Sequence, residues 1–98
     1  MRFDIKAEAL ADLENIYAFG FGEHGIDQTE DYLTGLRAQF SRLLEFPKLG
    51  PQASGLRQNL RIWKFEQHHI YYRVTPTSVT IVRILHHAMN AAARLQRS

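Results

Sequence analysis

The spacing of hydrophobic and polar residues divides the chain into a first half that is mainly helical and a second half that is rich in strands. Phe3 and Ile5 alternate with polar residues at the very start, which is typical of a short strand. From Ala7 onward, apolar residues instead recur every three or four positions, in two stretches that end at a group of glycines and at Pro47. Each apolar stripe needs cover, and the other helix is the nearest cover. The pattern therefore predicts an N-terminal strand followed by an antiparallel helix hairpin.

Each predicted helix has one apolar stripe. The stripes consist of Leu10, Leu13, Ile16 and Tyr17 in the first helix and of Leu33, Leu36, Phe40, Leu43 and Leu44 in the second. The helices are separated by Gly20, Gly22 and Gly25. Asp27, with Glu30 three residues later, has the form of a capping box and predicts the start of the second helix.

The second half of the chain is typical of an antiparallel sheet. Residues 60–66, 70–75 and 79–85 are rich in β-branched and aromatic side chains, and short turns at 67–68 and 76–78 separate them. Connections of this length require an antiparallel meander. Residues 79–85 are apolar in both alternating sets, which predicts a central strand.

These elements together predict an α+β fold. Its order is an N-terminal strand, a two-helix antiparallel hairpin, a three-stranded antiparallel meander and a short C-terminal tail or helix at 88–95, with a loop at 47–59. We expect the hairpin to pack through Leu13, Ile16, Leu36, Phe40 and Leu43 against the sheet face of Ile70, Tyr72 and Val74. A chain of 98 residues has room for one domain, 1–98.

Composition excludes several classes of protein. Apolar residues make up 45% of the chain, which is enough for a packed core and too much for a disordered segment. No apolar run approaches the ~18 residues of a membrane span, and the first ten residues lack the apolar core of a signal peptide. The absence of cysteine excludes disulfides, thiol catalysis and Cys-ligated zinc. We therefore expect a cytoplasmic protein without contact to membranes.

Charge is distributed unevenly although the net charge is only +2. From Leu56 onward the single acidic residue is Glu66, against the basic residues Arg57, Arg61, Lys64, Arg73, Arg83, Arg94 and Arg97. Such a half favours an acidic partner, but it falls short of a dedicated nucleic-acid binder, so we expect no sequence-specific DNA binding by this chain alone. The alternative is an ordinary solvated basic face.

The closing segment carries a resemblance to a known family. Residues 68–74 (His-His-Ile-Tyr-Tyr-Arg-Val), then 82–86 (Val-Arg-Ile-Leu-His) and Met89 resemble the closing signature of ParE-type toxins, in the ParE/RelE toxin–antitoxin superfamily. Supporting matches lie upstream at Ala9, Asp12, Leu13, Ile16, Leu43, Pro47, Gly50, Leu60, Arg61 and Trp63. The resemblance extends over nearly the whole chain.

This resemblance implies a function and its partners. It implies the toxin of a type II toxin–antitoxin system, which acts by binding and inhibiting DNA gyrase, has no catalytic residues or cofactor, and is neutralised by a ParD-like antitoxin. The family commonly ends its signature with Arg-Met-Asp, where this chain has Ala88-Met89-Asn90. Both changes remove a charge. Either they alter the contact with the target, or both positions face solvent and vary freely.

We expect two separate binding surfaces. Antitoxin-binding residues are predicted to be Leu10, Leu13 and Tyr17 on the helix hairpin and the cations Arg57, Arg61 and Arg73. Target-binding residues are predicted at the end of the signature, at Arg83, His86, His87, Met89, Asn90 and Arg94.

Two other functions compete with the inhibitor. RelE-like members of the same superfamily are ribosome-dependent mRNA endonucleases, which need an acid–base pair and cations for the developing phosphorane charge. Arg61, Arg73, Arg83 and His86 could supply these groups. However, the terminal Tyr typical of RelE-like chains is missing. The third hypothesis is a non-toxic protein-binding module on the same fold.

Several candidate residues also have purely structural interpretations. Neighbouring strand residues point to opposite faces, so we expect neither histidine pair, 68–69 or 86–87, to chelate a metal ion. His86 is expected to hydrogen-bond backbone at the strand end. Arg83 lies in an apolar strand and is expected either to pair with Glu66 or Asp4 or to act as a functional cation.

Overall fold

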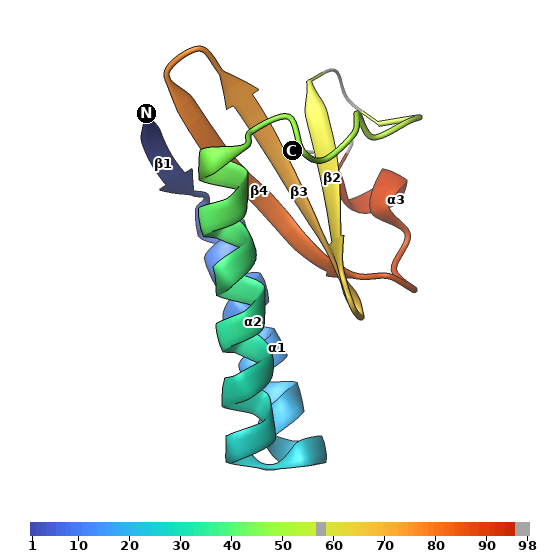
Figure 1. Ribbon diagram of the computed structural model, residues 1–98. Coiled ribbons are helices and arrows are strands. Elements are labelled where there is room, and N and C mark those ends of the chain that lie inside the picture. The colour runs from blue at the N-terminus through green and yellow to red at the C-terminus, as the bar shows by residue number, and fades with distance from the viewer. Residues whose placement is uncertain (57–58, 96–98) are drawn as a thin grey trace.

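The computed structural model describes residues 1–56 and 59–95 and has the predicted α+β order. The elements are β1 (Arg2–Ile5), α1 (Ala7–His24), α2 (Ile26–Glu45), β2 (Leu60–Phe65), β3 (His68–Thr75), β4 (Ser78–His86) and α3 (Ala91–Leu95) (Figure 1). Strands β3 and β4 are longer than predicted. In particular, β3 begins at His68, so the β2–β3 turn is Glu66-Gln67 and not Gln67-His68.

The sheet has the strand order β1-β4-β3-β2. Strands β2, β3 and β4 form the predicted antiparallel meander, and β4 is central as expected. Strand β1 adds to the free edge of β4 in parallel orientation, with Phe3 opposite Val79, which the alternation of residues did not predict. The N–H of Lys6, the residue after β1, donates to the carbonyl of Ile81 (2.9 Å). Helix α1 therefore begins beside β4.

A β-bulge in β4 explains why both alternating sets of its residues are apolar. Tyr71 pairs with Arg83 while the next residue, Tyr72, pairs with Ile81, so β4 has one residue more than β3 at this point. Ile81 and Ile84, three residues apart, therefore both belong to the core on the hairpin side. Val82 belongs to the core on the other side.

The helix hairpin, α1 and α2, turns at a single glycine. Gly25 has φ 84°, in the left-handed region that glycine adopts without strain, and α2 starts at the next residue. The predicted capping box is wrong, because α2 has no side-chain cap and Asp27 lies within its first turn, where a carboxylate still favours the helix dipole. Gly20 and Thr29 bring the two helices close: a Cβ on Gly20 would lie 2.8 Å from Thr29 Oγ1.

The main core lies between the helix hairpin and one face of the sheet. It contains the predicted Leu36, Phe40, Leu43, Ile70 and Tyr72, with Leu13, Ile16 and Val74 partly buried against it. The prediction of this packing is confirmed. No helix among the described residues is long and apolar enough to cross a membrane.

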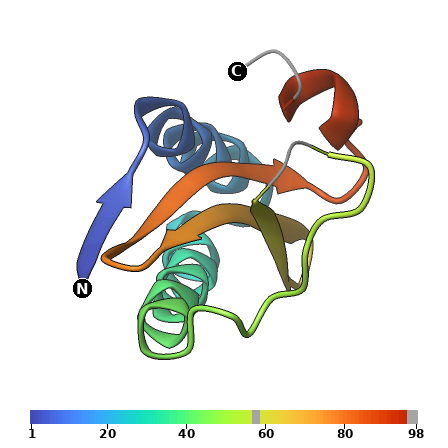
Figure 2. The ribbon, with the colours of Figure 1, turned by 90° about the horizontal axis from the view of Figure 1, so that it is seen from above.

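The second face of the sheet is also covered, by α3 and part of the loop before β2. Leu95 of α3 packs with Leu60, Tyr71, Val82 and Leu85 in a separate core, and Leu56 from the loop joins them. Figure 2 shows α3 on the side of the sheet away from α2. Tyr71 and Tyr72 lie in the cores on opposite faces of the sheet, and both are buried.

Candidate functional site

Arg83 is held by an ion pair with Asp12 of α1. Its Nε donates to Asp12 Oδ2 (2.8 Å) and its Nη2 to Oδ1 (2.9 Å), a bidentate geometry. Asp12 Oδ2 also accepts the backbone N–H of Ile84 (2.9 Å), which lies beyond the part of β4 that pairs with β1. The predicted pairing of Arg83 with Glu66 or Asp4 is wrong. Asp4 instead forms an ion pair with Arg2, two residues earlier in the chain, with 2.8 Å between Arg2 Nε and Asp4 Oδ2.

The Asp12–Arg83 pair is a structural feature of the hairpin–sheet contact. The two side chains are only 11% and 16% exposed, respectively. The hydrogen bond to Asp12 raises the pKa of the Arg83 guanidinium above its ordinary value, so the group stays charged. Arg83 is bonded to Asp12 and is largely buried, so it presents little surface to a target or a substrate.

The residues that a nuclease could use are spread along the sheet. Arg61 lies opposite Tyr72 in the β2–β3 ladder, and its Nη1 donates to the carbonyl of Gly50 (2.7 Å). His86 lies opposite His68 at the other end of β3. The positions of Tyr72 and His68 are four residues apart, about 13 Å along a strand. Arg61 and His86 are therefore too far apart to share one scissile phosphate.

Four histidines gather at the end of the sheet where β3 begins and β4 ends. The rings of His86 and His87 stack with centroids 4.4 Å apart, His68 lies edge-on to His86 at 5.4 Å, and the His69 ring is 6.5 Å from that of His87. We call His68, His69, His86 and His87 the histidine cluster. The expected divergence of 86–87 is wrong, because β4 ends at His86 and the chain turns there.

The histidine cluster is bonded mainly to backbone and to neighbouring neutral side chains. His86 Nδ1 accepts the N–H of Ala88 (3.1 Å), the strand-end backbone bond predicted for it. His87 Nε2 lies 2.9 Å from Gln67 Oε1. Among residues 1–56 and 59–95, no three histidine, aspartate or glutamate side chains are placed to hold a metal ion.

The remaining predicted target residues follow directly after β4. Residues 87–95, which we call the C-terminal tail, expose His87, Met89, Asn90 and Arg94. Asn90 Oδ1 accepts the N–H of Ala93 (3.2 Å) and so bonds the first turn of α3. The C-terminal tail thus exposes His87, Met89, Asn90 and Arg94 directly after His86, whereas Arg83 lies apart from them in its contact with Asp12.

The helix hairpin exposes apolar side chains along one side of α1. Leu10 is 47% exposed and Tyr17 38%, whereas Leu13 packs partly against the core. Phe21, one turn beyond Tyr17, is 53% exposed and stacks on it with centroids 6.4 Å apart. Leu10, Tyr17 and Phe21 lie on one line of the helix, which we call the α1 stripe.

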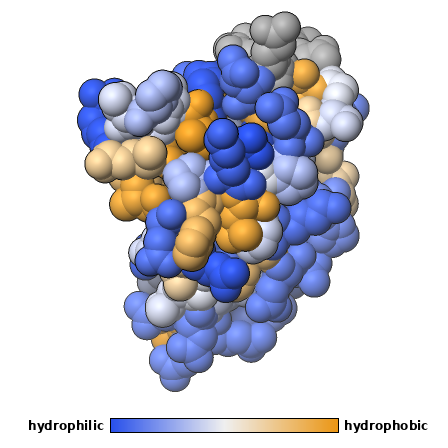
Figure 3. Space-filling view, turned by 45° about the horizontal axis from the view of Figure 1, so that its top comes forward, coloured by the Kyte–Doolittle hydropathy of each residue, from blue (hydrophilic) through white to orange (hydrophobic). Residues whose placement is uncertain are grey.

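A second open surface lies at the end of the sheet opposite the histidine cluster. An apolar hollow there is lined by Met1, Phe46, Pro47, Leu49, Val74 and Pro76. It adjoins a second hollow whose lining includes the polar side chains of Lys48, Gln52, Asn59 and Arg61. Figure 3 shows hydrophobic surface on this end of the molecule, bordered by hydrophilic surface. The predicted Arg73 is half-buried opposite Leu60, and Arg57 lies outside the described residues.

Comparison with known proteins decides the family. A family model described as "ParE toxin of type II toxin-antitoxin system, parDE" matches residues 3–91. The chain belongs to the ParE toxin family.

Relatives of this ParE toxin match it over nearly its whole length. Toxin ParE1 of Caulobacter vibrioides is 33% identical over 95% of this chain and 96% of its own. Toxin ParE1 of Mycobacterium tuberculosis is 30% identical over 96% of this chain and 97% of its own. A solved structure titled "Chromosomal ParDE TA system from P. aeruginosa" has the same fold, with a TM-score of 0.78 and 20% identity over 88% of this chain and 95% of that one.

Two features of the surface of this ParE toxin are absent from the residues predicted from the sequence. Phe21 is not among the predicted binding residues, although its spacing from Leu10 and Tyr17 places it on the α1 stripe. The apolar hollow was missed because Met1, Phe46 and Val74 come from three distant segments of the chain. Only the tertiary fold brings these segments together.

Proposed function

We propose that this ParE toxin arrests growth by binding a cellular target. We further propose that an antitoxin neutralises it by covering the helix hairpin and the end of the sheet that carries Arg61 and Arg73. The observation that carries the proposal is the α1 stripe. Leu10, Tyr17 and Phe21 remain open to solvent although both faces of the sheet are covered. Exposed apolar side chains in a row are typical of a protein-binding site.

The proposed partner is a ParD-like antitoxin, in line with the ParDE system named for the structural relative. Its apolar side chains would lie on the α1 stripe and against Leu13. Its acidic side chains would face Arg61 and Arg73, with Arg57 as a further candidate. Arg61 Nη1 bonds the carbonyl of Gly50, and the guanidinium has further donors that could face a carboxylate.

The proposed target is DNA gyrase in the cytoplasm, as expected for the family. We propose the exposed tail residues His87, Met89, Asn90 and Arg94, with His86, as its contact. An inhibitor needs such a surface and no acid–base pair. The separation of Arg61 from His86, and the engagement of Arg83 with Asp12, favour inhibition by binding over cleavage of mRNA.

Inducible expression in a bacterial host tests the proposal. We expect growth arrest with filamentation and induction of the SOS response, and normal growth when the antitoxin from the neighbouring gene is co-expressed. Variants Met89→Ser and Arg94→Ser should reduce toxicity, while His24→Ser at the hairpin tip should not. Growth arrest with cleaved mRNA and without the SOS response would favour the nuclease instead. Normal growth on expression of the chain alone would favour the non-toxic binding module.

A further inference from the structure

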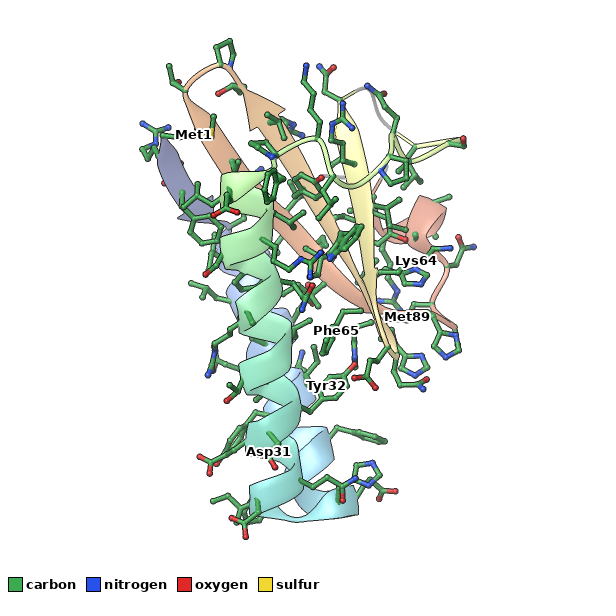
Figure 4. All side chains as sticks on the ribbon, viewed as in Figure 1. Met1, Asp31, Tyr32, Lys64, Phe65 and Met89 are labelled. Atoms are coloured by element: carbon green, nitrogen blue, oxygen red, sulfur yellow. The ribbon has the colours of Figure 1, made fainter. Side chains whose placement is uncertain are left out.

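Tyr32 connects the helix hairpin to the histidine cluster. From α2 it points toward Phe65 at the end of β2 (Figure 4), with ring centroids 5.4 Å apart. Its hydroxyl oxygen accepts the N–H of Gln67 (3.2 Å) and lies 2.7 Å from His68 Nδ1. The carbonyl of Phe65 also lies near the hydroxyl oxygen, at the longer distance of 3.5 Å. The 2.7 Å separation fits a bond in which the Tyr32 hydroxyl donates to His68 Nδ1 while His68 carries its own proton on Nε2.

The β2–β3 turn is bonded on both sides through Gln67. On one side its N–H donates to Tyr32 of α2 (3.2 Å). On the other side its carbonyl accepts the N–H of His87 (2.9 Å), and its side-chain oxygen lies 2.9 Å from His87 Nε2. Gln67 thus links the helix hairpin to the C-terminal tail, and His68 is the next residue in the chain.

We propose that Tyr32, Gln67 and the histidine cluster form an acid-sensitive latch, in which protonation of His68 releases α2 and the C-terminal tail from the β2–β3 turn. A proton on Nδ1 turns this nitrogen from an acceptor into a donor, so the short bond from Tyr32 is lost in its present direction. The new charge would also lie against the ring of His86, whose centroid is 5.4 Å away and which stacks on His87.

The surroundings of His68 disfavour its charged form. Burial and the neighbouring imidazoles of His86, His87 and His69 lower the pKa of His68 from 6.5 to about 4. Tyr32 packs against it from α2 as a neutral group. The one carboxylate that favours the charged form is Asp12 of α1, and its effect is the smallest of these. Asp12 is itself bonded to Arg83.

The direction of the pH effect follows from this lowered pKa. Because the unfolded chain binds a proton near pH 6.5 and the folded chain only near pH 4, stability is fully present above pH 6.5 and is lost as the pH falls toward 4. The equilibrium constant for unfolding should rise on the order of tenfold between pH 7 and pH 5 through this one group.

The test uses the purified full chain and has no toxicity readout, so it stands or fails independently of the proposed function. In imidazole NMR spectra we expect His68 to titrate well below the ordinary histidine pKa of 6.5. Backbone hydrogen exchange, corrected for its intrinsic pH dependence, should show that Gln67 and His87 lose protection between pH 7 and pH 5 before Tyr72 in the core does.

Two variants separate the latch from a general effect of acid. In His68→Asn the amide oxygen takes about the place of Nδ1, so the bond from Tyr32 persists without a titrating group, and most of the loss of protection at pH 5 should disappear. His24→Asn should behave as the wild type. A His68 that titrates near 6.5, or equal losses at Gln67, His87 and Tyr72 in the wild type, would overturn the proposal. The NMR titration and the hydrogen exchange of the wild type test the proposal even if His68→Asn folds poorly.

Discussion

Asp12 and Arg83 join the first helix to the central strand through two parallel hydrogen bonds of 2.8 and 2.9 Å. Asp12 also accepts the backbone N–H of Ile84. The pairing of β1 with β4 ends at Ile81, so the carboxylate takes the place of a carbonyl from a neighbouring strand. The ion pair therefore fixes how the helix hairpin sits on the sheet.

Replacing this carboxylate should destabilise the protein strongly. We expect Asp12→Ala to lower the free energy of unfolding by about 3 kcal/mol, because it leaves a largely buried guanidinium and the Ile84 N–H without their partner. Urea unfolding measures the change. Asp4→Ala is the matched control: its pair with Arg2 is exposed, and its loss should cost less than about 1 kcal/mol. Equal effects of the two variants would contradict the structural role of Asp12.

The α1 stripe should control neutralisation and not toxicity. We expect the double variant Leu10→Ser, Tyr17→Ser to stay folded, since both side chains are exposed, and to arrest growth as the wild type does. Loss of two apolar contacts should weaken antitoxin binding by at least tenfold, measured by calorimetry.

Phe19 provides the control for the α1 stripe. It is 69% exposed but lies on the opposite side of α1 from Tyr17. Phe19→Ser should therefore leave antitoxin affinity nearly unchanged. If Phe19→Ser weakens binding as much as the double variant does, the antitoxin does not recognise the α1 stripe specifically.

Two glycines should respond to alanine in opposite directions. A Cβ on Gly50 would collide with the Ile62 carbonyl and lie 2.8 Å from the Tyr72 hydroxyl, so Gly50→Ala should destabilise the fold by about 2 kcal/mol. A Cβ on Gly22, within α1, meets nothing within 4 Å. Gly22→Ala should stabilise the helix by about 0.5 to 1 kcal/mol. Thermal unfolding of the two variants measures both changes. A Gly50→Ala variant that is more stable than the wild type would contradict the close packing of Gly50 against Ile62 and Tyr72.

Periodicity alone predicted most of the fold, because the apolar residues of each element lie on one face. The stripe from Leu33 to Leu43 and the alternation from Ile70 to Val74 predicted the core on the hairpin side. The bulge in β4 could not be predicted in this way, since an apolar run fits both a regular strand and a bulged one. Coverage of the second sheet face by Leu95 likewise depends on where the tail turns.

The candidate site was predicted less well, since its parts meet only through long-range contacts. Asp12 and Arg83 are 71 residues apart in the chain, and nothing in their local pattern pairs them. The histidine cluster depends on the register that places His68 opposite His86 and on the end of β4 just before His87. Leu10 and Tyr17 of the α1 stripe could be predicted from their helical spacing, and Met89, Asn90 and Arg94 of the tail from their place after the last strand.

Inhibition of DNA gyrase by the purified chain is the most direct measurement of the proposed mechanism. We expect the toxin to inhibit supercoiling by gyrase in a concentration-dependent way, the purified antitoxin to reverse the inhibition, and Met89→Ser with Arg94→Ser to weaken it. Ribosomes programmed with mRNA should show no cleavage under the same conditions. Unimpaired supercoiling together with mRNA cleavage that Arg61→Ala or His86→Ala abolishes would contradict the account.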